Sequence, residues 1–304
     1  MCVGFWAFDH GDYALLLCTN RDEFLARPTT QADFHSFGHE SDPDIGDGTI
    51  LSGRDLQAGG TWMGINRDGK LALLTNITEP AAKWTSSRGH VVSSYLMSPH
   101  SHTLDDELQR LASEDGDFAG FNLFLACPSH RKGQSLSLDA GLVTNHGGGG
   151  TITTRILSDT EKRCGGMSNG VDGRGDPEWP RVTHGRQNLM DVLASLPPQV
   201  NESDLVEHLF ELLSWKSREP VRHRSELRNT IQIPPMMIPE GDTPTSDKAL
   251  YGTRLSTVIL IRKDGQATFV ERDIYKLDTM GEPVKAGAST QRIFRFQLRA
   301  SEVT

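Results

Sequence analysis

Short apolar runs, joined in pairs by glycine-containing turns, dominate the pattern of hydrophobic and polar positions along the chain. The pairs are residues 3–8 and 13–19 around DHGD, 61–65 and 70–76 around NRDG, and 256–261 and 267–272 around RKDG. Paired runs of this length around such turns predict antiparallel β-hairpins. Further apolar runs at 121–126 and 135–144 predict additional strands.

Two other segments repeat apolar residues at helical spacing. Residues 103–114 begin with a Thr-x-x-Asp capping pattern, and residues 201–217 place Leu205, Leu209 and Leu212 at i, i+4 and i+7. Both patterns are typical of amphipathic helices that bury one face. Helices are also expected near 86–97 and 184–196.

The strands at 13–19 and 70–76 are almost continuously apolar, which suits strands that are covered on both faces. We therefore expect an α+β fold in which sheets lie between layers of helices. The chain is long enough for one large domain, and we expect a single domain over 1–304. Proline and turn-forming residues predict surface loops near 31–50 and 231–250.

Composition narrows the classes of function. The net charge of -9 and the isoelectric point near 5.6 disfavour a nucleic-acid groove, and no basic run is present. No apolar run approaches the length of a membrane span, and the apolar start lacks the basic flank of a secretory signal. Four cysteines without a CxxC pair predict neither a zinc ribbon nor a disulfide framework. These features predict a soluble protein of a reducing compartment, the cytoplasm.

Cys2 directly follows the initiator methionine, at the start of a predicted strand. Removal of Met1 would leave a thiol and a free α-amine on one residue, and the amine could act as base for the thiol. A chance position is the alternative.

Several separate segments agree, in order, with one family. They are TNRDEF (19–24), GRDLQAGGTWMGIN (53–66), KLALLTN (70–76), FNLFLA (121–126), MSNG (167–170), EWPRV (178–182) and YGTRLSTVILI (251–261). With these segments the chain resembles the NRDE protein family, also called the Transport and Golgi organisation protein 2 family. The resemblance implies roles in Golgi organisation, protein secretion, lipid and acyl-coenzyme A metabolism or movement of haem, in the cytoplasm and in association with the Golgi or mitochondria.

A second, more distant resemblance indicates a specific chemistry. Cys2, its hairpin and GINRDGKLALLTN are similar to amino-terminal-nucleophile cysteine hydrolases, which cleave amides and share a four-layer αββα sandwich. The similarity implies that Cys2 is the nucleophile, that Asp22 holds its amine, that Asn76 donates to the oxyanion and that Asn169 orients the nucleophile or the amide. The departure is Arg21, because these hydrolases carry arginine where this chain has Thr19.

Each candidate residue also has a structural interpretation. Arg21 and Asp22 could form a buried ion-pair network that fixes the hairpin, and Asn76 and Asn169 could be turn residues. Arg254, which follows the proline-rich segment, could bind an anionic ligand or remain a solvated charge.

The histidine pairs 35/39 and 100/102 lie in polar surroundings without matching acidic or cysteine residues. We therefore assign no metal ligands and expect no cofactor.

Two functions remain. One is a Cys2-dependent amidohydrolase or thioesterase acting on an acyl-bearing small molecule. The other, which the implied cellular roles favour, is a protein that binds or transfers a hydrophobic anionic ligand, such as an acyl-coenzyme A, a lipid or haem, in a hydrolase-like pocket. In the first, Cys2 is processed and reactive, whereas the second requires only the pocket.

Overall fold

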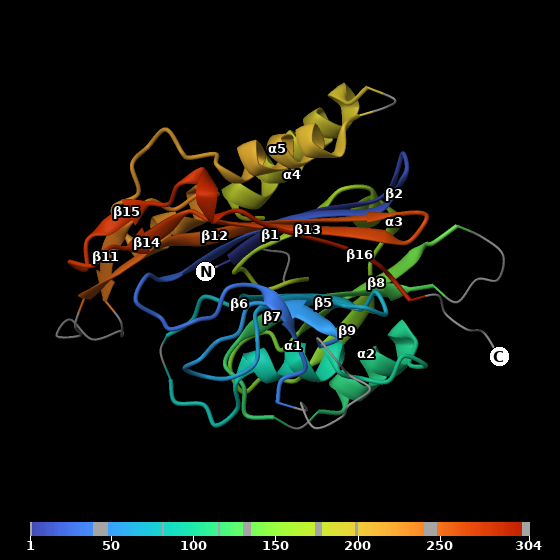
Figure 1. The fold of residues 1–304 in the computed structure, drawn as a ribbon. Helices are drawn as coiled ribbons and strands as arrows, with labels where there is room; N and C mark the ends of the chain where they lie inside the picture. Colours follow the sequence, from blue (N-terminus) through green and yellow to red (C-terminus); the bar gives the residue numbers. More distant parts are fainter. Residues whose placement is uncertain are drawn as a thin grey trace.

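Two β-sheets face each other between two layers of helices (Figure 1). The computed structural model describes residues 2–38, 48–80, 82–114, 116–129, 135–173, 178–197, 200–239 and 248–299. The helix–sheet–sheet–helix order confirms the expected four-layer αββα arrangement of an α+β fold. No helix among these residues is long and apolar enough to cross a membrane.

The first sheet is antiparallel throughout, with strand order β10-β1-β2-β12-β13-β16 and β11 paired to β12. Its strands are β1 (Cys2–His10), β2 (Tyr13–Phe24), β10 (Gly165–Met167), β11 (Met236–Pro239), β12 (Lys248–Arg262), β13 (Gln266–Asp273) and β16 (Arg292–Gln297). The first and last predicted hairpins form the β1–β2 and β12–β13 pairs, so both predictions are confirmed.

The second sheet is also antiparallel and follows chain order from β3 to β9. Its strands are β3 (Asp33–His35), β4 (Ile50–Ser52), β5 (Met63–Asn66), β6 (Leu71–Asn76), β7 (Phe121–Pro128), β8 (Leu138–Thr144) and β9 (Thr153–Ile156). The middle predicted hairpin is the β5–β6 pair. A separate hairpin joins β14 (Tyr275–Leu277) to β15 (Pro283–Lys285).

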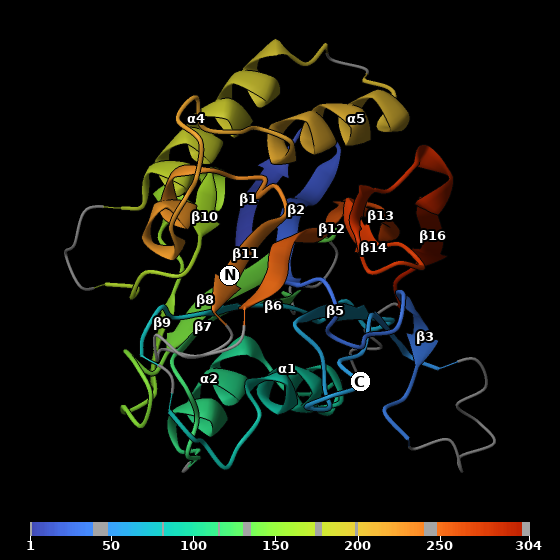
Figure 2. The ribbon, with the colours of Figure 1, turned by 90° about the vertical axis from the view of Figure 1, so that its left-hand side faces the viewer.

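Helices α4 (Pro180–Ser195) and α5 (Glu202–Leu213) cover the first sheet, and α1 (Arg88–Leu96) and α2 (Leu104–Ala112) cover the second (Figures 1 and 2). All four expected helices are present, and Thr103 and Asp106 form the predicted capping box of α2. The short α3 (Asp159–Arg163) precedes β10, and two 3-10 helices lie at Arg224–Asn229 and Ala288–Thr290.

The apolar strands are covered on both faces because each sheet separates two hydrophobic clusters. Trp6, Leu15 and Leu73 belong to the cluster between the sheets, where Trp6 packs on Phe124 with ring centroids 4.5 Å apart. Side chains on the opposite face of the first sheet, such as Leu16, pack against α4 and α5. This two-sided burial explains the nearly continuous apolar runs that predicted the layering.

The two stretches expected as surface loops also contain short strands. Within 31–50, β3 pairs with β4, and within 231–250, β11 pairs with the start of β12. Ile231 and Ile233 are fully buried. Residues 39–47 and 240–247 of these stretches lie outside the described residues.

Candidate active site

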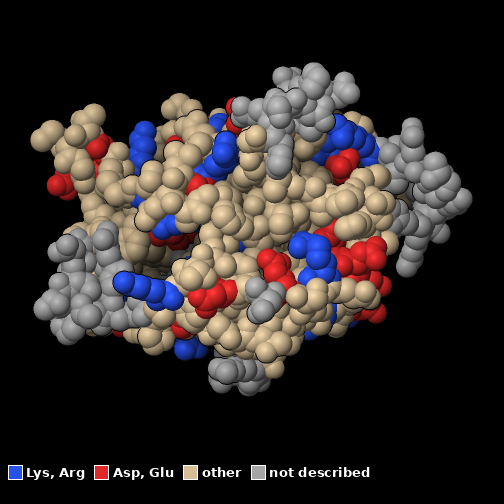
Figure 3. Space-filling view, turned by 90° about the horizontal axis from the view of Figure 1, so that it is seen from below, with Lys and Arg blue, Asp and Glu red and all other residues tan. Residues whose placement is uncertain are grey.

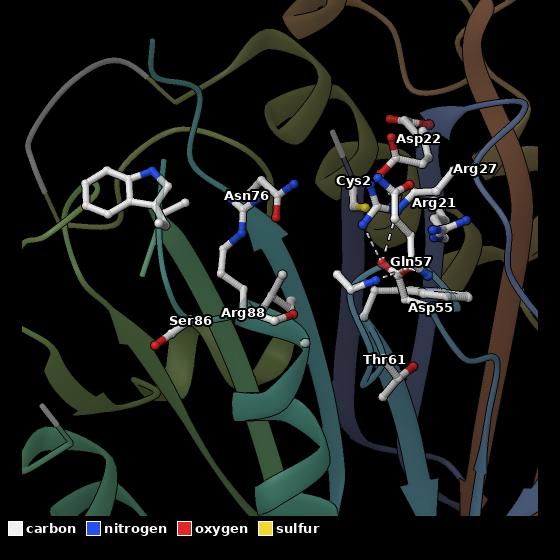
Figure 4. Close-up of a pocket in the computed structure, with 18 of the residues that line it drawn as sticks. Cys2, Arg21, Asp22, Arg27, Asp55, Gln57, Thr61, Asn76, Ser86 and Arg88 are labelled. Carbon is white, nitrogen blue, oxygen red and sulfur yellow. Dashed lines mark hydrogen bonds and ion pairs between the residues drawn. The ribbon is translucent and has the colours of Figure 1, made fainter. Parts of the chain in front are cut away.

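A cavity of about 630 Å³ opens where the ends of β1, β2 and β6 meet the start of α1 (Figure 4). Cys2, Arg21 and Asp22 contribute to its wall from the first sheet, Asn76 from β6 and Arg88 from α1. Three of the four residues proposed for catalysis therefore line one cavity, although more than 50 residues separate Asp22 from Asn76 in the chain.

Cys2 is the first residue of β1 and stands opposite Arg21 of β2 in the sheet register. Its backbone carbonyl accepts hydrogen bonds from Arg181 Nη2 at 2.9 Å and from Ser168 Oγ at 3.1 Å. The residue is 9% exposed, and burial raises the pKa of its thiol. The thiol is therefore protonated near neutral pH and needs a base to become a nucleophile.

The Asp22 carboxylate is held from two sides. Oδ1 accepts from Thr253 Oγ1 at 2.6 Å, and Oδ2 accepts from Arg181 Nη1 at 3.1 Å. The Asp22 carbonyl also accepts a hydrogen bond from the Tyr251 hydroxyl at 2.8 Å. Burial raises the pKa of Asp22, whereas the Arg181 charge and the hydrogen bond from Thr253 oppose that rise.

Arg181, which the sequence interpretation missed as a site residue, connects these groups. It is fully buried near the start of α4 and, besides Cys2 and Asp22, donates to Ser168 Oγ at 2.7 Å and to Asn169 Oδ1 at 2.6 Å. Its only signal in the sequence is its place in EWPRV, one of the segments that carry the family resemblance. A single arginine beside Pro180 does not reveal that it is buried.

Asn169 is fully buried and is absent from the cavity wall. Its Nδ2 donates to the Asn76 carbonyl at 2.5 Å, while its Oδ1 accepts from Arg181. Asn169 is thus placed to position Asn76 and Arg181, and not to contact a ligand in the cavity. Asn76 ends β6 and does line the cavity.

Arg21 reaches the cavity, in contrast to Thr19. The Arg21 guanidinium lies 3.8 Å from the centroid of the Trp62 ring, and the residue is only 4% exposed. Its Nη1 is buried and has no hydrogen-bond partner among the described residues. Thr19 instead donates to the Val3 carbonyl at 2.8 Å. The arginine of this chain therefore sits directly beside Cys2, two residues after the position that the hydrolase pattern indicates.

Arg254, the second candidate ligand-binding residue, is absent from the wall of this cavity. It lies at an irregularity in the β2–β12 pairing, and its Nη1 donates to the Arg27 carbonyl. Burial lowers the pKa of Arg254 to about 10. Arg27 itself lines the cavity and pairs with Asp55 at 2.7 Å, so Arg254 supports a lining residue without lining the cavity itself.

Solved structures with a similar arrangement include two hydrolases. Conjugated bile acid hydrolase from Clostridium perfringens, as the mutant C2A, matches with a TM-score of 0.48 and 8% identity over 100% of both chains. An N-acylethanolamine-hydrolyzing acid amidase ortholog from Caenorhabditis elegans matches with a TM-score of 0.46 and 13% identity over 86% of this chain and 93% of that chain.

Sequence relatives cover almost the whole chain. A Transport and Golgi organization 2 homolog from Mus musculus is 31% identical over 291 residues, 92% of this chain and 95% of the relative. The Homo sapiens homolog is 29% identical over 91% of this chain and 95% of its own length, and the Drosophila melanogaster protein is 25% identical over 93% and 95%. The family model described as Transport and Golgi organisation 2 matches residues 1–276. The chain therefore belongs to the Transport and Golgi organisation 2 family.

Proposed function

We propose that the cavity binds an acyl-bearing small molecule and that Cys2 attacks its acyl carbonyl, as in an amidohydrolase or thioesterase. The observation that carries this proposal is the buried network around the first residue of β1. Arg181 holds the Cys2 carbonyl and the Asp22 carboxylate together, and both ion-pair side chains are fully buried. A buried ion pair adds little net stability, so a need to position Cys2 explains it better.

The chemistry requires removal of Met1. The α-amine of Cys2 then lies on the same residue as the protonated thiol, and amines of this kind titrate near pH 8. The thiol sulfur attacks the acyl carbon while its proton passes to the amine. The resulting ammonium returns the proton to the leaving nitrogen or sulfur as the old bond breaks. Water then hydrolyses the thioester with the amine as base, which regenerates Cys2 and releases the acid.

Two neighbours of Cys2 fit supporting roles in this scheme. Asn76 shares the cavity wall with Cys2 and carries an amide that can donate to the tetrahedral oxyanion. The Asp22 carboxylate, fixed by Arg181 and Thr253, can stabilise the positive charge that the amine acquires.

A second candidate is binding or transfer without chemistry, for a hydrophobic anionic ligand such as an acyl-coenzyme A, a lipid or haem. It is favoured by the nearly buried, protonated Cys2 thiol, because such a thiol without a neighbouring base is inert. A carrier needs only the cavity, and its binding of the ligand does not require removal of Met1. The family's association with Golgi organisation is compatible with either candidate.

The test begins with the intact mass of the protein purified from cells, since retention of Met1 excludes the proposed base. Wild-type protein, Cys2→Ala and Cys18→Ala are then assayed for hydrolysis of matched acyl amides and acyl thioesters and for binding of the same compounds. Cys18 is a suitable control because it is a buried thiol in the core between the first sheet and the helices.

We expect Cys2→Ala to abolish turnover while binding and stability stay close to wild type, because the thiol acts in the transition state. Cys18→Ala should keep its turnover. Hydrolysis that persists unchanged in Cys2→Ala would refute the nucleophile. Tight binding without turnover in the processed wild type would instead identify a carrier.

A further inference from the structure

We propose that the start of α1, with Arg21 and Arg88, forms a subsite for an anionic group, a carboxylate or a phosphate, within the Cys2 cavity. The inference rests on the proposed function for the acyl part of the ligand only. The anion subsite itself follows from two independent features of the cavity wall, a helix N-terminus and a buried guanidinium.

The first feature is the half-buried beginning of α1. Ser86, Ser87, Arg88 and Gly89 all line the cavity, and Ser87 is the N-cap of this nine-residue helix. The Ser87 side chain makes no capping hydrogen bond, and the first turn contains no acidic residue. The first amide groups of a helix and its dipole favour an anion at this end.

A close approach of two backbone segments holds this helix end against the cavity. Gly60 has a φ of +71°, and a Cβ at that position would lie 2.4 Å from the carbonyl oxygen of Gly89. The Thr61 amide donates to the same Gly89 carbonyl at 3.3 Å. Since Thr61 also lines the cavity, the loop before β5 fixes the start of α1 at the cavity wall.

The second feature is Arg21. A guanidinium that is 96% buried normally satisfies its donors, because an unpaired buried donor costs about 1–3 kcal/mol. Arg21 Nη1 has no hydrogen-bond acceptor among the described residues. The residue lines the cavity, and its guanidinium stacks on Trp62. An oxygen of a bound anion would satisfy it.

The carboxylates that line the cavity already have partners. Asp22 pairs with Arg181, Asp55 pairs with Arg27, and Glu23 lies 4.0 Å from Arg27 and accepts from the Phe24 amide. The remaining arginines, Arg21 and Arg88, form no ion pair within the described part of the chain. Arg88 Nη1 donates to the Gly120 carbonyl at 2.9 Å, and its side chain extends from α1 toward Asn76 (Figure 4). The carboxylate with the largest effect on Arg88 is Glu79, which accepts from the Gly120 and Gly148 amides and forms no ion pair with Arg88 within the described part of the chain. Arg21 and Arg88 therefore carry positive charge without an ion-pair partner, in a protein whose net charge is -9.

The positive charge of the cavity does not extend over the molecular surface seen from below. On the lower face of the molecule, the basic and acidic side chains drawn in colour are interspersed (Figure 3). Such a mixed surface gives little long-range attraction for anions. Arg21 and Arg88, which form no ion pair within the described part of the chain, instead line the cavity, where lower exposure to water strengthens their interaction with a ligand.

The register limits how far the anionic group lies from the reactive carbonyl. Cys2 and Arg21 are paired across β1 and β2, and the Cβ atoms of directly opposed residues are roughly 5 Å apart. A ligand whose carbonyl meets the Cys2 thiol can therefore place its negative charge beside the Arg21 guanidinium in the same cavity. We infer an anionic acyl compound whose carboxylate or phosphate occupies the same cavity as the reacting carbon.

The test uses two alkylating reagents of similar size, anionic iodoacetate and neutral iodoacetamide. In both reactions the thiolate forms an S–C bond and iodide leaves, so the test does not depend on hydrolytic turnover. The rate at Cys2 is followed by peptide mass spectrometry, and the ratio of the iodoacetate rate to the iodoacetamide rate is compared with the same ratio for glutathione. Inorganic phosphate and acetate are added in separate arms as protecting anions.

We expect the ratio at Cys2 to exceed that of glutathione at least tenfold. Arg88→Gln should lower this ratio at least fivefold, because it slows the reaction with iodoacetate more than the reaction with iodoacetamide. Arg67→Gln is the matched control, because Arg67, like Arg88, is half-buried and donates to a backbone carbonyl, that of Gly48 at 3.3 Å, but is not among the cavity residues. The anion that protects wild type more than Arg88→Gln identifies the preferred group.

A wild-type ratio equal to that of glutathione would overturn the subsite. If Cys2 reacts with neither reagent, thermal unfolding decides. Phosphate or acetate should then raise the melting temperature of wild type and of Arg67→Gln more than that of Arg88→Gln. Equal shifts in all three proteins would reject the proposal, whatever the outcome of the hydrolysis assay.

Discussion

Replacement of Arg181 by methionine tests whether the buried network is organised as the structure indicates. Methionine approximates the aliphatic part of arginine but leaves the Asp22 carboxylate buried without its ion-pair partner, and it removes donors to Cys2, Ser168 and Asn169. Breaking a buried pair in this way typically costs about 3–5 kcal/mol. Because whole proteins are stable by roughly 5–15 kcal/mol, this loss is a large fraction of the total.

The assay is urea unfolding of wild type, Arg181→Met, Arg186→Met and the double variant Arg181→Met/Asp22→Asn. Arg186 is on the same helix but forms a partly exposed pair with Glu178, so its replacement should cost no more than about 1 kcal/mol. The double variant should recover part of the loss, since the unpaired charge is gone. Equal costs for Arg181→Met and Arg186→Met, or no recovery in the double variant, would refute the reasoning.

The pH dependence of the same variants gives a second measure. Burial raises the pKa of Asp22 in the folded state above its value in the unfolded state. At a pH between these two pKa values the folded state binds more protons, so the free energy of unfolding falls as pH rises. Arg181→Met removes the charge that opposes the rise in the Asp22 pKa, so the pH range over which stability falls should extend to higher pH. Acidification from neutral pH should therefore stabilise Arg181→Met more than wild type, by up to about 1.4 kcal/mol per pH unit. The effect should vanish when Asp22 is replaced by asparagine.

Two matched pairs of variants test other parts of the site. Thr253→Val should cost about 1–3 kcal/mol of unfolding free energy, because it removes the donor to the buried Asp22 Oδ1. Thr257→Val should be neutral or stabilising, since the buried Thr257 hydroxyl has no partner among the described residues. Comparable costs for the two variants would contradict this. Gly60→Ala should lower the free energy of unfolding by several kcal/mol, because it combines backbone strain with a clash. Gly11→Ala, at a φ of +55° with no heavy atom within 4 Å of the added Cβ, should lower it by only about 1–2 kcal/mol. Equal losses would exclude the clash.

Local sequence patterns predicted the parts of the fold that depend on local information. Apolar pairs around glycine turns predicted three hairpins, and helical spacing predicted α2 and α5, because these signals lie within about 20 residues. Short strands such as β10 and β11 escaped prediction. They have only three and four residues and form because β1 and the first residues of β12, which precede its pairing with β13, offer them an unpaired edge that no local pattern reports.

The candidate site was predictable only as far as segments of the family pattern contain its residues. Cys2, Arg21 and Asp22 lie near the cavity because one hairpin places them at adjacent strand ends. Arg181 is 159 positions from Asp22, and only the packing of α4 against the first sheet brings the two together. Long-range burial of this kind has no signature in the local sequence.

The polar segment at the end of β2 directs successive side chains to opposite faces of the first sheet. Asn20 Nδ2 donates to the carbonyls of Leu213 and Ile231, and Asp22 meets Arg181 of α4, so both side chains serve the helix layer over the first sheet. Arg21, between them, points to the opposite side and stacks on Trp62 in the cavity. Alternation along a strand therefore lets consecutive residues fix the helix layer and supply charge to the cavity. A one-residue shift of β2 would exchange these sides and bury Asp22 against Trp62, so the register of β2 is itself part of the site.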